Sequence, residues 1–277
     1  MYKYFRPRVR SRHPSHAPLR NGVLPLFPFK SVIRFGSSKE FEDGRIEVNT
    51  VNAIKNSSNK LLMKDCFTED GVKTADWWQY LIDGMFANQI TNEEDCIENL
   101  PYPIISKSHF GSRNNGNTKH NSKEELEAWM ENKNLDNYIF EKYYNYNREY
   151  RLHVSEDGCF YTCRKMLKND APQEVRWYRN DAHCNWILED NELFDKPVNW
   201  DEVVKESVKA LKAVGLDFGA VDLRIQSAKD RNGEVRENPE FIIVEINSAP
   251  SLGDITLQKY IAELPKILLK KKQQRDE

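Results

Sequence analysis

The chain has 277 residues, of which 39% are apolar, 11% aromatic and 30% charged. This apolar and aromatic content is too high for a disordered chain, although a mean hydropathy of −0.76 indicates a polar surface. The apolar runs are of strand size and fall short of the roughly 18–20 residues that a membrane-spanning helix needs, so no membrane partner is expected.

A near-neutral total charge conceals an asymmetry along the chain. Because the total is −2 and residues 1–39 carry +9 with no acidic residue, the remainder carries −11. The nine basic residues are Lys3, Arg6, Arg8, Arg10, Arg12, Arg20, Lys30, Arg34 and Lys39. Such a stretch is typical of a segment with its own partner. An anionic substrate, a nucleic acid or an acidic protein surface is therefore a candidate partner for residues 1–20, beside a plain basic extension.

The cysteines indicate a reducing compartment. Cys66, Cys96, Cys159, Cys163 and Cys184 are odd in number, scattered, and contain no Cys-x-x-Cys pair. The basic N-terminus lacks the apolar stretch of a secretory signal, so a cytoplasmic protein is expected. A zinc site formed by Cys159, Cys163, His183 and Cys184 is disfavoured because its spacing fits no common zinc pattern.

The first part of the chain predicts short elements. Residues 1–22 are rich in Arg, Pro, Ser and His without periodicity, and are expected to form a basic extended arm. Local spacing then predicts strands at 32–35 and 46–51, a helix at 52–68 and an apolar strand at 104–105. This last strand leads to Lys107 and to a polar loop at 111–117.

Stronger signals follow. A capping box at 122–125 predicts a helix. Strands are expected at 138–144, 150–154 and 158–166, and a helix begins at Asn199 and ends before Gly215. Two strands at 219–225 and 241–246 close the core, and a last helix is expected at 255–269. Strands mixed with helices, many of the strands antiparallel neighbours, predict an α+β fold.

Polar side chains interrupt the two closing strands. Asp222 and Arg224 share one face of the first, and Glu245 and Asn247 share one face of the second. Such residues are costly on central strands unless something pairs with them. Two carboxylates and an amide oxygen suit a hard cation such as Mg²⁺, which is usually shared with phosphates. A solvated sheet face is the alternative explanation.

Two further segments carry weaker signals. Backbone N–H groups of the 111–117 loop can cradle phosphates, although a plain surface turn explains this loop alone. The aromatic strand at 138–144 contains Glu141, and Glu149 lies eight residues further on. Aromatic strand residues are more often core than a pocket for a base.

Together and in this order, these pieces resemble the ATP-grasp superfamily of carboxylate–amine ligases. The resemblance is closest to the branch with RimK-like glutamate ligases and D-alanine–D-alanine ligases. It spans about residues 49–255 and is carried by segments 49–50, 59–60, 103–107, 111–117, 141–144, 149–152, 178–180, 219–222 and 245–250. It implies an ATP-grasp fold, in which two α+β subdomains clasp ATP.

The resemblance also implies a division of the chain into four parts. Residues 1–22 would be the basic arm and residues 23–58 a short N-terminal region before the grasp. Residues 59–137 would form the central, lid subdomain, and residues 138–277 the C-terminal subdomain with the metal site.

Roles in nucleotide binding follow by position. Lys60 and Lys107 would contact the ATP phosphates, and a lid loop containing Gly111, Ser112 and Arg113 would fold over them. Glu141 would accept a hydrogen bond from the adenine amino group. The backbone of Lys142, Tyr143 and Tyr144 would complete this hinge, and Glu149 would hold the ribose hydroxyls.

The metal and the chemistry follow in the same way. Asp222, Glu245 and Asn247 would bind two Mg²⁺ ions, for which Mn²⁺ can substitute. Further basic positions near the phosphates or the acyl phosphate are Arg151, Arg164 and Arg179. The implied reaction activates a carboxylate as an acyl phosphate with ATP and joins it to an amine, with ADP and phosphate as products. Substrates would be small molecules or peptides, a protein included.

One departure concerns the reacting centre. In the D-alanine ligase branch an arginine two residues before the metal aspartate stabilises the oxyanion, and Ala220 occupies that position here. Arg224 shares the same face and is the candidate replacement, so Lys107, Arg179 and Arg224 are the candidate catalytic residues. The region before the grasp is also shorter than usual, so substrate identity cannot be carried over.

Two other functions remain open from the sequence. The first is a nucleotide-binding or assembly protein with the same fold, whose basic arm binds nucleic acid or an acidic partner. The second is a kinase that uses phosphoryl transfer alone. The sequence leaves the oligomeric state open, a homodimer included.

Overall fold

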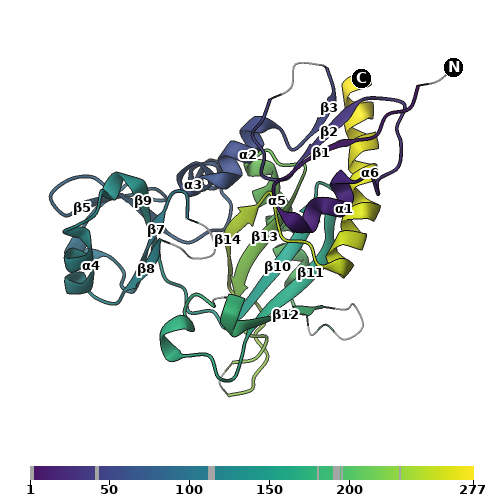
Figure 1. Cartoon of the computed structure of the whole chain (residues 1–277). Helices are drawn as coiled ribbons and strands as arrows, with labels where there is room; N and C mark the ends of the chain where they lie inside the picture. The colour runs from purple at the N-terminus through teal and green to yellow at the C-terminus, as the bar shows by residue number, and fades with distance from the viewer. Residues whose placement is uncertain are drawn as a thin grey trace.

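The structure is a computed structural model that describes residues 3–40, 44–111, 116–179, 181–189, 194, 196–230 and 232–277. Within these residues the strands form three sheets (Figure 1). No described helix is both long enough and apolar enough to cross a membrane.

The N-terminal residues form a small parallel sheet. Its strands are β1 (Arg8–Arg10), β2 (Ser31–Arg34) and β3 (Ile46–Val48), with the short helices η1 (Pro14–His16) and α1 (Ala17–Arg20) beside them. The prediction of an extended arm at 1–22 is therefore wrong. Val9 and Leu19 are buried in the core that this sheet shares with α6 (Asp254–Asp276), so the segment folds to bury them.

The central part is a six-stranded sheet in the order β6-β5-β4-β9-β7-β8. Its strands are β4 (Trp77–Tyr80), β5 (Met85–Asn88), β6 (Glu94–Cys96), β7 (Ile104–Ser108), β8 (Asn117–His120) and β9 (Tyr138–Lys142). Helix α4 (Lys123–Met130) packs on it through Leu126, and Ser122 Oγ caps the helix by accepting from the Glu125 N–H. Because β9 pairs with both β4 and β7, the predicted boundary after residue 137 is wrong, and the predicted lid subdomain, called the lid below, extends through Lys142.

The C-terminal part is a five-stranded antiparallel sheet in the order β12-β11-β10-β13-β14. Its strands are β10 (Arg148–Ser155), β11 (Gly158–Leu167), β12 (Cys184–Leu188), β13 (Phe218–Ile225) and β14 (Phe241–Asn247). One face packs on α2 (Val51–Ser58), α3 (Lys60–Glu69) and α5 (Trp200–Ala213). Because α3 supplies Met63 and Phe67 to this core, the helical start of the predicted lid belongs to the C-terminal sheet.

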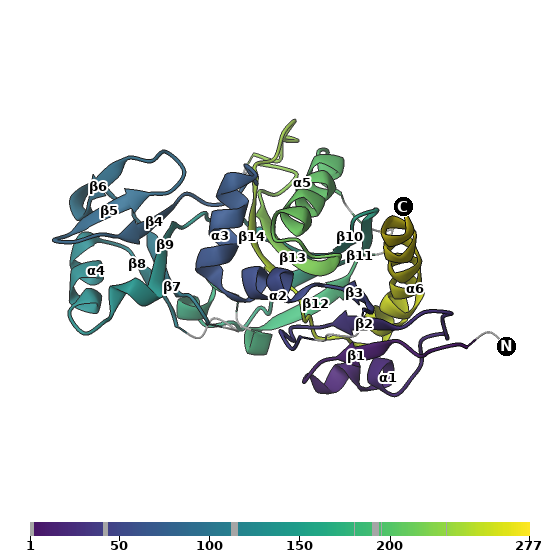
Figure 2. The same ribbon diagram turned by 90° about the horizontal axis from the view of Figure 1, so that it is seen from above.

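The opposite face of this sheet packs on α6 at one end. There His153 of β10 contacts Tyr260 of α6, and Phe218 joins the core that α6 shares with the N-terminal sheet. Figure 2 shows α6 and the N-terminal strands together on one side of the molecule and the lid on the other, with α3 between the lid and the C-terminal sheet. The remainder of this face carries the polar side chains of β10, β13 and β14.

Candidate active site on the C-terminal sheet

The predicted metal ligands converge on this face. Asp222 of β13 pairs in register with Glu245 of β14, and Ala220 pairs with Asn247. The amide Nδ2 of Asn247 donates to Asp222 Oδ2 and to Glu245 Oε1, each at 3.1 Å. The prediction that these three side chains share a face is confirmed. Two carboxylates therefore lie within hydrogen-bonding reach of one amide.

Arg151 on the neighbouring strand β10 closes the site. Its Nε and Nη2 contact the two carboxylate oxygens of Asp222 at 2.6 and 2.7 Å. Burial raises the pKa of Asp222 to about 6, although Arg151 opposes this and Glu245 adds to it. The sheet thus holds a concentrated negative charge that a single guanidinium partly balances.

Two lysines from other elements complete the charge balance. Lys60 is the first residue of α3, where the side chain of Asn59 caps the helix. Burial lowers the pKa of Lys60, whereas Glu245 raises it and Lys107 lowers it further. Lys60 donates to the carbonyl of Gly111. Lys60 and Lys107, predicted to contact phosphates, therefore lie within electrostatic range of the metal ligands.

A buried cluster surrounds Glu141 of β9. Lys107 Nζ lies 2.5 Å from Glu141 Oε2, and Lys64 Nζ lies 3.1 Å from Oε1. Burial alone would raise the pKa of Glu141, but the two lysines outweigh it and hold the pKa below its usual value. Lys64 is fully buried and donates to Thr74 Oγ1 at 2.6 Å, and burial lowers its pKa to about 8.

Lys64 is the residue that the sequence prediction missed. It follows Lys60 by four residues on the same helix, a spacing that puts both side chains on one face. That spacing was the available signal. A lysine on a helix face is ordinarily solvated, however, so the spacing alone does not predict that Lys64 is buried.

Glu149 gathers the other predicted cations. Its Oε2 lies 3.2 Å from Arg224 Nε and 4.0 Å from Arg179 Nε, and its Oε1 lies 3.9 Å from Lys165 Nζ. Arg224 Nη2 also donates to the Trp177 carbonyl at 2.7 Å. The structure thus places Arg179 and Arg224 at Glu149, one row of the sheet away from Asp222.

Arg164 is not brought to the site. In the register of β10 and β11 it pairs with Tyr150, whose side chain lies in the apolar core on the other face of the sheet. Its Nε forms a 2.7 Å ion pair with buried Glu189. The next residue, Lys165, faces the site instead, because side chains alternate along a strand.

The predicted hinge joins β9 to β10. The backbone N–H groups of Lys142 and Tyr143 donate to the carbonyls of Asp76 and Pro103, at 3.0 and 2.9 Å. The Tyr144 hydroxyl donates to the Asp76 carboxylate at 3.0 Å. The end of the lid strand is therefore tethered from both sides, beside Glu141. Ser112 and Arg113 of the predicted lid loop lie outside the described residues.

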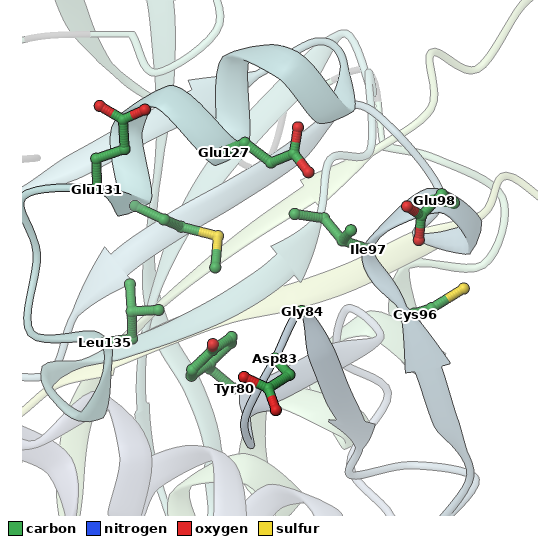
Figure 3. A pocket seen from close by; sticks show the side chains of 10 residues that line it. Tyr80, Asp83, Gly84, Cys96, Ile97, Glu98, Glu127, Glu131 and Leu135 are labelled. Carbon is green, nitrogen blue, oxygen red and sulfur yellow. The ribbon is translucent and has the colours of Figure 1, made fainter.

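A cavity of about 470 Å³ lies within the lid. Figure 3 shows Glu127 of α4 and Glu131, the residue that follows this helix, on one side of it and Tyr80 of β4 on the other. None of the predicted site residues lines this cavity. It is therefore separate from the site on the C-terminal sheet.

The alternative zinc site finds no support in the described part of the chain. No group of three or more His, Cys, Asp or Glu side chains there is arranged to hold a metal ion, and all five cysteines are free thiols. The Asp222, Glu245 and Asn247 set has two carboxylates and an amide. Three such side chains do not fill the octahedral coordination that Mg²⁺ demands, so further oxygen ligands would have to come from water or from phosphates.

Comparison with known proteins gives no match to a protein-family model and no match to a curated protein sequence. Solved structures do match. Carboxyaminoimidazole ribonucleotide synthase from Aspergillus clavatus, complexed with ATP, has a TM-score of 0.59 and 18% identity, over 86% of this chain and 59% of that one.

Two further matches belong to the same fold. D-alanine–D-alanine ligase from Coxiella burnetii has a TM-score of 0.55 and 15% identity, over 88% of this chain and 69% of that one. The ATP-grasp ligase PsnB, complexed with a minimal precursor, has a TM-score of 0.51 and 16% identity, over 82% and 65%. The predicted fold is therefore confirmed: the chain has the ATP-grasp fold.

Proposed function

We propose that the protein is an ADP-forming ligase that uses ATP and Mg²⁺ to activate a carboxylate and join it to an amine. One observation carries the proposal: Asp222, Glu245 and Asn247 converge beside Arg151, within electrostatic range of Lys60 and Lys107. The similar structures support it, since their names describe ligases and a synthase, one of them complexed with ATP.

The residues present fit Mg²⁺. The donors are the carboxylate oxygens of Asp222 and Glu245 and the amide oxygen of Asn247, and a hard cation prefers such oxygens. Both carboxylates already accept a hydrogen bond from the same Asn247 amide group. These three residues would hold two ions, for which Mn²⁺ would substitute. Bound there, Mg²⁺ would neutralise charge on the phosphates.

Nucleotide binding is assigned to the hinge and the lysines. Glu141 would receive the adenine amino group, with the carbonyls of Lys142 and Tyr143 beside it, because their N–H groups are already used. Glu149 would hold the ribose. Lys60 and Lys107 would bind the phosphates as point charges, and both lie within electrostatic range of Glu245.

Phosphoryl transfer comes first. A substrate carboxylate oxygen attacks the γ-phosphorus of ATP, the bond to the β-phosphate oxygen breaks, and ADP leaves with the electron pair. The product is an acyl phosphate. The ammonium groups of Lys60 and Lys107 would lie next to the transferring phosphoryl group, where negative charge spreads in the transition state. Electrostatic stabilisation and positioning therefore provide most of the catalysis.

Amide formation follows. The amine nitrogen attacks the acyl carbon, a tetrahedral oxyanion forms, and the C–O bond to phosphate breaks as the amine loses a proton to solvent. We assign the stabilisation of this oxyanion to Arg151 in place of Arg224. Arg151 contacts Asp222 directly, whereas Arg224 is held by Glu149 and the Trp177 carbonyl.

Hydroxylamine tests this proposal without knowledge of the natural amine. A panel of amino acids, short peptides and dicarboxylates is incubated with the protein, ATP, Mg²⁺ and hydroxylamine, and ADP and hydroxamates are measured. The proposal predicts ADP release that requires a carboxylate, matched by an equal amount of hydroxamate. Carboxylate-independent ATP hydrolysis, or no ADP with any member of the panel, would contradict it.

A further inference from the structure

Trp186 is a large aromatic residue on the edge strand of the C-terminal sheet. It belongs to β12 and pairs in register with Lys165 of β11, which pairs with Glu149 of β10. Residues that pair across antiparallel strands lie on the same face, and every second residue of a strand shares that face. Trp186 therefore lies on the face that carries Glu149 and Arg151.

Core packing does not explain this side chain. Trp186 is 40% exposed and belongs to none of the three apolar clusters of the described residues, whereas Trp77 and Trp78 of the lid are buried. A single exposed apolar residue is ordinary at a protein surface. The contacts of the ring must therefore show what Trp186 does.

Two cations lie over the ring. The guanidinium carbon Cζ of Arg151 is 4.6 Å from the centre of the Trp186 ring, and Lys165 Nζ is 5.2 Å from it. An aromatic ring attracts a cation that lies over its face within about 6 Å, and tryptophan does so most strongly. Trp186 therefore stabilises both cations in the positions that they occupy.

Each of these cations also contacts a carboxylate, and the two carboxylates have different proposed roles. Arg151 contacts Asp222, a candidate metal ligand, at 2.6 and 2.7 Å. Lys165 Nζ lies 3.9 Å from Glu149, which is proposed to hold the ribose. Loss of the ring would act on the reacting centre through Arg151 or on nucleotide binding through Lys165, and kinetic constants separate these two effects.

The geometry of Arg151 favours the first route. Asp222 accepts from Nε and Nη2, which form one edge of the planar guanidinium. No described residue accepts a hydrogen bond from Nη1. With one edge held by Asp222 and the group held over the Trp186 ring, the Nη1 N–H groups remain to donate to a reacting oxygen.

We propose that Trp186 is a positioning residue: its ring holds the Arg151 guanidinium where it stabilises the oxyanion that forms when the amine attacks the acyl phosphate. The inference rests on the proposed ligase function, in which Arg151 has this role. It adds a residue of the edge strand that acts through Arg151.

Kinetics in the hydroxylamine assay test this role at saturating ATP and carboxylate. Trp186→Leu keeps an apolar side chain but removes the ring, so kcat/KM for hydroxylamine should fall about tenfold, the scale of a partly desolvated cation–π contact. KM for ATP should stay unchanged, because Lys165 keeps its contact with Glu149. Trp186→Phe keeps a ring and should retain kcat/KM within about threefold. Tyr4→Leu, which removes an exposed ring from the N-terminal segment, is the control and should change neither constant.

A double-mutant cycle identifies the partner of Trp186. Arg151→Gln removes the guanidinium but keeps an N–H donor for Asp222. In this background Trp186→Leu should lower kcat/KM for hydroxylamine by less than about twofold further, because two changes in one contact are not additive. A further loss as large as in the wild-type background would show that Trp186 acts by another route.

Nuclear magnetic resonance adds a readout that does not depend on turnover. The Nε–H signal of Arg151, identified by its loss in Arg151→Gln, should be shielded by the ring current of Trp186. Trp186→Leu should move this signal downfield, Trp186→Phe should move it less, and Tyr4→Leu should leave it in place.

Three results would overturn the positioning role and leave the ligase function standing. They are an unmoved Arg151 signal in Trp186→Leu, equal kinetic effects of the leucine and phenylalanine replacements, and a raised KM for ATP in place of a lowered kcat/KM for hydroxylamine. Absence of ADP release with every carboxylate would overturn both.

Discussion

One extra residue in β14 places the candidate metal ligand Glu245 on the same face of the sheet as Asp222. Asp222 pairs with Glu245, yet the next residue of β13, Leu223, pairs with Ile243, so Val244 has no partner on that strand. Side chains alternate along a regular strand. Without the bulge at Val244, Glu245 would lie on the same face of the sheet as Ile243, which is the face that packs in the apolar core. A bulge of this kind beside a site re-aims a side chain.

Glu245→Gln tests this residue directly. The amide keeps the size and most hydrogen bonds of the carboxylate but loses its negative charge, so turnover should fall at least about a hundredfold while the melting temperature changes by a few degrees at most. ADP release and thermal unfolding measure the two effects. Glu237→Gln, at an exposed position, is the control. Normal turnover in Glu245→Gln would refute the metal assignment.

The buried cluster of Lys64, Glu141 and Lys107 concerns stability as well as binding. Glu141 contacts both lysines, and Thr74, which accepts from Lys64, donates to the carbonyl of Ile243 in β14 at 2.9 Å. The cluster therefore connects α3, the central sheet and strand β14, which carries the candidate metal ligands Glu245 and Asn247. Removing one member leaves a buried charge without its partner.

A double-mutant cycle measures this coupling. Lys64→Met is expected to lower the free energy of unfolding by about 3–5 kcal/mol. The double variant Lys64→Met with Glu141→Gln is expected to lower it by less than the sum of the two single effects. Thr74→Val, which removes one neutral hydrogen-bond partner, should cost about 1 kcal/mol. Urea unfolding supplies the values. Additive effects of the two charge-removing changes would show that Lys64 and Glu141 act independently.

A buried histidine attaches the N-terminal elements to the loop that follows β14. His16 at the end of η1 is fully buried; its Nε2 donates to the carbonyl of Pro250 at 2.8 Å, and Ser11 Oγ lies 2.5 Å from its Nδ1. Burial lowers the pKa of His16 to about 4, the Pro250 carbonyl opposes this, and His13 and Arg20 add to it. The neutral ring thus joins the N-terminal segment to the loop that follows the metal ligands.

Acid should loosen this attachment. Because the folded-state pKa lies below the ordinary 6.5, the stability that His16 contributes is fully present above pH 6.5 and is lost as pH falls through 4. The free energy of unfolding of the wild type should decrease across this window by up to about 1.4 kcal/mol per pH unit from this group. His16→Gln, which cannot gain the proton, should show a shallower slope. Parallel pH profiles of the two proteins would contradict this account.

Elements with strong local signals were predictable, and those fixed by distant partners were not. The capping box at Ser122 and the alternation at Asp222 and Glu245 are properties of a few adjacent residues, and the structure bears out both. Arg164 was predicted to lie near the phosphates or the acyl phosphate, but the register of β11 puts it on the other face of the sheet, and its neighbour Lys165 faces the site. Lys64 and the folded N-terminus depend on tertiary burial, which local pattern does not encode.

At the scale of the whole molecule, the charge asymmetry has a partly structural explanation. Of the nine N-terminal cations, Arg34 is fully buried and pairs with Glu47 at 3.0 Å, and Arg20 donates to the carbonyls of Ser11 and His13. These charges stabilise the N-terminal sheet. An anionic partner of residues 1–20 stays a prediction, and it would meet a folded surface.

The rest of the chain, which carries a net charge of −11, brings charged side chains from three elements together. The lid supplies Lys107, helix α3 supplies Lys60, and the C-terminal sheet supplies the carboxylates, so cations from two elements face the carboxylates of a third. This arrangement brings the two lysines that are proposed to bind phosphate within electrostatic range of Glu245. The proposed function requires that a carboxylate of the substrate attacks the γ-phosphorus of ATP at this place.

That central claim is tested most directly by isotope transfer. A carboxylate substrate found with the hydroxylamine assay is labelled with ¹⁸O in its carboxylate, and the inorganic phosphate released with ADP is examined by mass spectrometry. An acyl phosphate intermediate predicts that one ¹⁸O atom passes from the carboxylate to phosphate in each turnover. Phosphate without label, or a stable phosphorylated product that retains it, would contradict the ligase account.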